Sequence, residues 1–195
     1  MTAAVRLLFF AGSSRAGSYN KKLARLGTLI AEANGIPSTF ADLGDYPMPI
    51  YNGDLEAAEG QPENAHKLKA LMAAHSGIFI ASPEYNASIT PLLKNTIDWV
   101  SHVRDGGETG FEVYKTRVFA LGSASPGGMG GLRSLTTVRQ VLELGLGALV
   151  LPDQFAVPRA NEAFGEDGHL KNKDSQENFK ALIQKLARAA HVLHG

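Results

Sequence analysis

Short apolar runs that do not alternate with polar residues constrain the fold of this chain more than any other feature. The runs LLFFA, IFIA, VFAL and ALVL are apolar at successive positions. Strands buried on both faces, as in a parallel sheet covered by helices, require this pattern. We predict five such strands, at residues 5–11, 39–43, 77–81, 117–121 and 148–151.

Segments with apolar residues at helical spacing separate the predicted strands. We expect helices over residues 18–33, 63–75, 89–103, 131–144 and 175–193. Strict alternation of strand and helix indicates a three-layer α/β fold with a parallel sheet and helices on both faces. Five strands favour the flavodoxin-like order 2-1-3-4-5 over the six-stranded dinucleotide fold. A chain of 195 residues is expected to form one domain over its whole length.

The composition narrows the classes of function. Nineteen basic residues balance nineteen acidic ones, so charge gives no reason to expect a nucleic acid or a membrane surface as partner. The chain has no cysteine, which excludes disulfides, thiolate metal sites and a cysteine nucleophile, and fits a cytoplasmic protein. The apolar run at the N-terminus is too short for a membrane span and lacks the basic start of a signal peptide.

The loops after the first, third and fourth strands are the candidate ligand sites, because ligands of such sheets bind at the carboxyl ends of strands. The first loop, GSSRAGSYN, places Ser14 where the dinucleotide fingerprint needs its second glycine. It places Ser18 and Tyr19 where a P-loop needs its lysine and hydroxyl residue, which argues against ATP or GTP chemistry. A hydroxyl-rich loop that opens a helix suits a phosphate monoester.

The charge of the N-terminal segment also favours an anion. The first 31 residues contain five basic side chains and no acidic one: Arg6, Arg15, Lys21, Lys22 and Arg25. Lysines in the first turns of a helix oppose its macrodipole, and we expect a bound anion to relieve this conflict. The alternative is a plain turn capped by Ser18, with solvated lysines.

The loops after the third and fourth strands are expected to line other sides of the same ligand site. Pro83 stiffens the turn after the third strand, where we expect the amides of Glu84, Tyr85 and Asn86 to face a ligand and the Tyr85 ring to pack on a planar heterocycle. Alternatively, Tyr85 only covers the end of the sheet. The loop GSASPGGMGG (122–131) allows close approach of backbone, although a mobile surface loop would have the same composition. FMN, with a terminal phosphate and a flat polar ring, has the shape that all three loops would use.

Three stretches, GSSRAGSYN, PEYNASITPLLKNTIDW and GGMGGLRSLTTVRQVLELGLGALVLP, resemble motifs of the NADPH-dependent FMN reductases of flavodoxin-like fold. This family includes quinone, chromate and azo-dye reductases, and the resemblance covers about residues 5–155. It implies FMN as cofactor and NADPH or NADH as co-substrate. The cofactor-binding residues that it implies are Ser13, Arg15, Ser18, Tyr19 and Asn20 for the phosphate, Pro83, Glu84, Tyr85 and Asn86 for the ring, and Ser123, Ser125 and Gly128 around the ring and ribityl chain. Which of the two serines contacts flavin stays open.

The resemblance implies an enzyme that passes a hydride from NAD(P)H to bound FMN and then two electrons to an acceptor such as a quinone, free flavin, azo compound or chromate. Because the flavin carries the chemistry, no catalytic side chain and no metal is expected. A homodimer or homotetramer, paired through the helix near Ile89, is also implied.

The alternative function is that of a flavodoxin-like FMN electron carrier without direct NAD(P)H oxidation, although such carriers are often strongly acidic. A flavin-free regulator is a third reading. We discount a ribose-binding role for Asp42 and expect packing or a subunit contact for Asp98 and Trp99.

Overall fold

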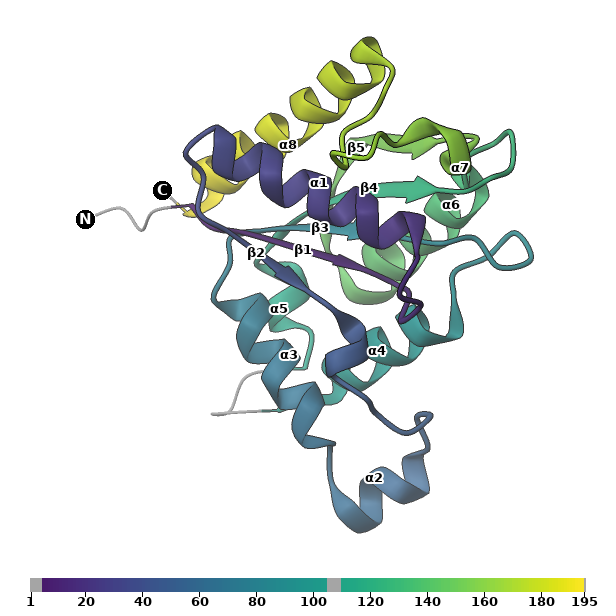
Figure 1. Ribbon diagram of the computed structural model, residues 1–195. Helices are drawn as coiled ribbons and strands as arrows, with labels where there is room; N and C mark the ends of the chain where they lie inside the picture. Colours follow the sequence, from purple (N-terminus) through teal and green to yellow (C-terminus); the bar gives the residue numbers. More distant parts are fainter. Residues whose placement is uncertain (1–4, 105–109, 195) are drawn as a thin grey trace.

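The structure, a computed structural model, describes residues 5–104 and 110–194. Five parallel strands form one sheet in the order β2-β1-β3-β4-β5, which confirms the predicted order (Figure 1). The strands are β1 Leu7–Ala11, β2 Ser38–Ala41, β3 Gly77–Ala81, β4 Val118–Ala124 and β5 Leu149–Val157.

Helices cover both faces of the sheet, as predicted. They are α1 Tyr19–Ala33, α2 Gly53–Glu59, α3 Glu63–Ala73, α4 Pro91–His102, α5 Glu112–Lys115, α6 Leu132–Gln140, α7 Ala160–Ala163 and α8 Lys173–His194, with a 3₁₀ turn η1 Leu43–Asp45 and a π turn η2 Val141–Gly145. Four short elements (η1, α2, α5 and α7) had no predicted counterpart. None of the described helices is both long and apolar enough to cross a membrane.

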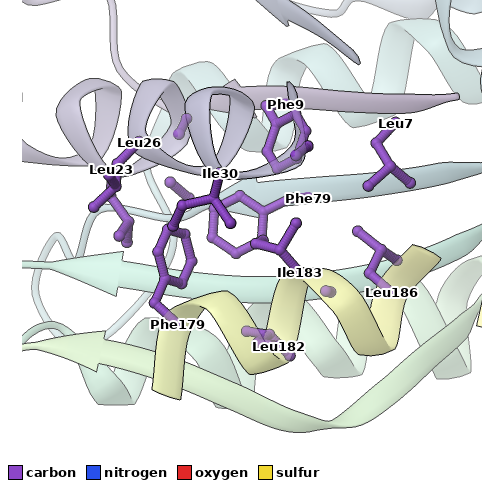
Figure 2. Packing of buried hydrophobic residues seen from close by; sticks show 14 of the residues in the cluster. Leu7, Phe9, Leu23, Leu26, Ile30, Phe79, Phe179, Leu182, Ile183 and Leu186 are labelled. Atoms are coloured by element: carbon purple, nitrogen blue, oxygen red, sulfur yellow. The ribbon is translucent and has the colours of Figure 1, made fainter. Parts of the chain in front are cut away.

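Alternate residues of the strands form two separate cores. Leu7 and Phe9 of β1 pack with α1 and α8, and Figure 2 shows Phe179 of α8 close to the Phe79 ring on this face. Leu8 and Phe10 point to the opposite face, where they join a cluster with residues of α3, α4 and α6. Because every residue of β1 and β3 is buried, both faces require apolar side chains.

The fourth and fifth strands are longer than predicted. The prediction ended β4 at Leu121 and placed Gly122 and Ser123 in a loop, whereas both residues pair with β5 as part of the sheet. Glycine at this strand position has a steric reason, because a Cβ on Gly122 would lie 2.6 Å from the Phe79 ring. Gly122, Ser123 and Ala124, whose sequence predicts a loop, therefore form the buried end of β4.

Trp99 has the packing role predicted for it. It is fully buried, and its indole Nε1 donates a hydrogen bond to Pro49 O at 2.7 Å. The Tyr51 ring lies edge-on to it, with ring centroids 4.9 Å apart. Trp99 thus fastens the segment between β2 and α3 to α4.

Candidate functional site

Three chain segments leave the sheet side by side at its carboxyl edge. Gly12 N, after β1, donates to Ala81 O of β3 at 3.0 Å, and Ser82 N donates to Gly122 O of β4 at 2.8 Å. The hydroxyl of Thr90, which caps α4, donates to Gly12 O at 2.6 Å. The structure therefore brings together the loops after β1, β3 and β4, which were predicted to bind a ligand.

The first loop ends in a helix cap. Ser18 caps α1, as the alternative reading expected: its buried Oγ accepts a hydrogen bond from Lys21 N at 3.4 Å. The first amides of a helix have no carbonyl one turn earlier. The amides of Tyr19 and Asn20 are in this position and make no hydrogen bond in the described part of the chain. They are available to an anion at the mouth of α1.

Two exposed cations stand beside these amides. The Arg15 guanidinium and the Lys22 ammonium each lie 5.8 Å from the centroid of the Tyr19 ring. Neither cation has a carboxylate partner among residues 5–104 and 110–194. Ser13, on the same loop, is partly exposed. The start of α1 therefore carries a local positive charge.

Lys21 does not behave as the sequence predicted. Its side chain is only 6% exposed, and its Nζ donates to Asp42 Oδ2 at 2.7 Å and to Ser14 O at 3.0 Å. Asp42 relieves the conflict between this lysine and the helix dipole. Burial by itself would raise the pKa of the Asp42 carboxyl, but hydrogen bonds from Lys21 and the Gly44 amide outweigh it and leave the pKa below its usual value.

The side chain of Asn20 is also committed to the fold. It is buried, with Nδ2 donating to Ala124 O at 2.8 Å and Oδ1 accepting from Ala124 N at 3.0 Å. This pair of bonds ties the start of α1 to the end of β4. The predicted phosphate contact of Asn20 needs correction, because its buried side chain is bonded to Ala124. The backbone N–H of Asn20, which makes no hydrogen bond among the described residues, is the group that faces an anion site.

The second loop is a tight two-residue turn. Tyr85 and Ser88 exchange two backbone hydrogen bonds, at 2.9 and 3.0 Å. Asn86 and Ala87 between them have positive φ of 50° and 63°. The Tyr85 amide is thus occupied, contrary to prediction, whereas the amides of Glu84 and Asn86 make no hydrogen bond in the described residues. The Tyr85 side chain is 58% exposed, and Pro83 behind it is buried.

Glu84 joins the second loop to the third. Its carboxylate, 9% exposed, accepts from the Arg133 backbone N at 3.2 Å and from Arg133 Nε at 2.7 Å. The backbone bond falls in the first turn of α6, where a negative charge is favourable. Glu84 thus fixes the position of α6, and Arg133 is already paired.

The two serines of the third segment have different surroundings. Ser123 is fully buried, and its hydroxyl donates to Gly130 O at 2.8 Å. Ser125 is partly exposed and accepts from Gly127 N at 3.2 Å. Gly128 is exposed, with open space around the position of a Cβ. A ligand at this edge therefore has access to Ser125 and Gly128 but not to the Ser123 hydroxyl.

A pocket of about 370 Å³ lies next to the third loop, between the end of β5, α7 and the start of α8. Its lining includes Phe155, Arg159 and Lys171, and none of the predicted site residues. Arg159 N donates to Gly127 O at 3.3 Å, so the pocket adjoins the site without being part of it.

Known proteins resemble this chain in both sequence and fold. Residues 5–162 match the family model of NADPH-dependent FMN reductases. A probable NADPH:quinone oxidoreductase from Oryza sativa subsp. japonica is 34% identical, over 98% of this chain and 92% of its own. A quinone reductase from Escherichia coli is 34% identical, over 73% of this chain and 71% of its own. The solved structure of a flavoenzyme NAD(P)H:(acceptor) oxidoreductase from Paracoccus denitrificans superposes with a TM-score of 0.77 at 24% identity, covering 97% of this chain and 99% of that one.

Proposed function

Because this chain belongs to the NADPH-dependent FMN reductase family, we propose that it passes a hydride from NAD(P)H to bound FMN and then two electrons to a small-molecule acceptor. Membership makes the chain an oxidoreductase with FMN as cofactor and NAD(P)H as reductant, as the sequence predicted. The acceptor that we propose first is a quinone, because the relatives from rice and E. coli are named for quinones. Free flavin, azo compounds and chromate are further candidates.

The observation that carries this proposal is the anion site at the start of α1. Among the described residues, the amides of Tyr19 and Asn20 make no hydrogen bond, and the cations of Arg15 and Lys22 have no carboxylate partner. These four groups suit the phosphate of FMN. Ser13 lies on the same loop and supplies a further hydroxyl. The residues present therefore fit the phosphate end of the cofactor.

The second and third loops suit the ring. The exposed Tyr85 side chain supplies an aromatic face. The amides of Glu84, Asn86 and Gly128 make no hydrogen bond in the described chain, so they remain as donors to a polar ring edge. Such donors hold the ring in orientation and stabilise negative charge that develops on it. Of the two serines, we assign the flavin contact to Ser125.

The spectrum of the purified protein tests this function. The protein is mixed with FMN without oxygen, freed of excess flavin, and its visible absorption is followed after addition of NADPH or NADH. Rapid bleaching of protein-bound flavin, followed by recovery of the colour on adding a quinone, is the expected result. Bound flavin that neither nucleotide bleaches would favour the electron-carrier alternative, and absence of bound flavin would refute the assignment of the three loops. A homodimer or homotetramer remains our expectation, which the elution volume of the same sample would test.

A further inference from the structure

The ion pair between Lys21 and Asp42 lies directly behind the first loop. Lys21 lies in the first turn of α1, and Asp42 follows β2 as the cap of η1, where it also accepts from Gly44 N at 2.9 Å. The Lys21 side chain is almost fully buried, whereas its neighbour Lys22 is exposed. A buried ammonium needs a partner to offset its desolvation, and Asp42 supplies it.

Lys21 also bonds one peptide group of the loop. Its Nζ donates to Ser14 O at 3.0 Å, and no backbone amide in the described residues bonds this carbonyl. The carbonyl and the N–H of a trans peptide point in opposite directions because the group is planar. With Ser14 O held toward Lys21, the Arg15 N–H points away from Lys21, to the side where it meets Ser13 Oγ at 3.4 Å.

We propose that Lys21 is a positioning residue of the cofactor site, which acts through the Ser14 carbonyl and not by contact with the cofactor. This inference rests on the proposed function, because it concerns the loop that holds the FMN phosphate. Asp42 pairs with the Lys21 ammonium and cancels its charge. The attraction for the phosphate comes from Arg15, Lys22 and the helix amides, whereas Lys21 keeps the loop carbonyl turned away from the anion.

The preference for FMN over riboflavin measures this role. Riboflavin lacks the phosphate, so general damage to the fold weakens the binding of both flavins, whereas a misdirected phosphate loop weakens only FMN. The double variant Lys21→Met/Asp42→Asn removes the ion pair without changing the net charge. The single variant Asp42→Asn leaves Lys21 able to donate to Ser14 O. Lys94→Met is the matched control, because Lys94 forms an ion pair with Asp98 on the exposed side of α4.

The double variant should lose about tenfold in the ratio of the two dissociation constants, the equivalent of one charge-assisted hydrogen bond. Asp42→Asn should not lower the ratio, because Lys21 can still donate to Ser14 O and its charge, no longer cancelled by a carboxylate, favours the phosphate. Lys94→Met should keep the wild-type ratio. A double variant with the wild-type ratio of dissociation constants would overturn the proposal. A loss of about tenfold in this ratio for Asp42→Asn alone would also overturn it. The single variant therefore stays informative if the double variant does not fold. A wild-type protein that binds neither flavin would instead refute the proposed function, so the two failures are distinguishable.

Discussion

Replacement of Asn20 by alanine tests whether its side chain holds the fold together without any cofactor. The variant removes two hydrogen bonds to Ala124, at 2.8 and 3.0 Å, inside a buried contact between α1 and β4. A buried backbone group left without a partner costs about 1–3 kcal/mol. Because the substitution leaves both the N–H and the C=O of Ala124 unpaired, we expect the free energy of unfolding to fall by about 2–6 kcal/mol. In a chain of this size each kcal/mol corresponds to roughly 2–4 °C of melting temperature.

Urea unfolding of the flavin-free protein, followed by circular dichroism, is the assay. Asn178→Ala is the matched control, since Asn178 is an exposed asparagine on α8 and surface changes usually alter stability by less than about 0.5 kcal/mol. If Asn20→Ala in the absence of flavin were as stable as the control, the role of Asn20 as a brace would be refuted and a role as cofactor ligand restored.

Three further predictions concern other parts of the chain. Burial lowers the pKa of His75 below its ordinary value of 6.5, so the folded protein binds a proton there less readily than the unfolded chain does. The contribution of His75 to stability should therefore be complete above pH 6.5 and decrease as the pH falls below it. His75→Gln should reduce this pH dependence in urea titrations at several pH values. Gly27→Ala should cost about 1–3 kcal/mol in thermal unfolding, because its Cβ would lie 2.6 Å from the Phe9 ring, and an unchanged melting temperature would contradict this packing. Arg15→Ala should weaken FMN binding by about 1.5–3 kcal/mol in a fluorescence titration, and equal affinity would remove Arg15 from the site.

The architecture was predictable because the physical signals for it are local. Uninterrupted apolar runs identify strands buried on both faces, and helical spacing between them leaves few topologies. The signal failed where one tertiary contact decides the local structure. Gly122 reads as a loop residue, yet the Phe79 ring leaves room only for glycine within β4.

The site was predictable as a set of loops but less so as a set of contacts. A motif shows which polar residues are present, but not which partner each one chooses. Asn20 bonds Ala124, which is 104 residues away, and Lys21 of α1 pairs with Asp42, which follows β2. The spacing of these residues in the sequence does not determine their hydrogen-bond and ion-pair partners, because those partners depend on the complete fold.

The bonds that join the three loops have a consequence for how a cofactor arrives and leaves. Asn20 links the first loop to β4, Glu84 links the second to α6, and Ser123 supports the backbone of the third. Every one of these bonds lies within the protein, so none of them depends on a ligand and we expect the site to be preformed. Binding then requires little loss of conformational entropy, and release leaves no loop to be rebuilt. A scaffold of this kind suits repeated exchange of flavin with solution as well as permanent retention.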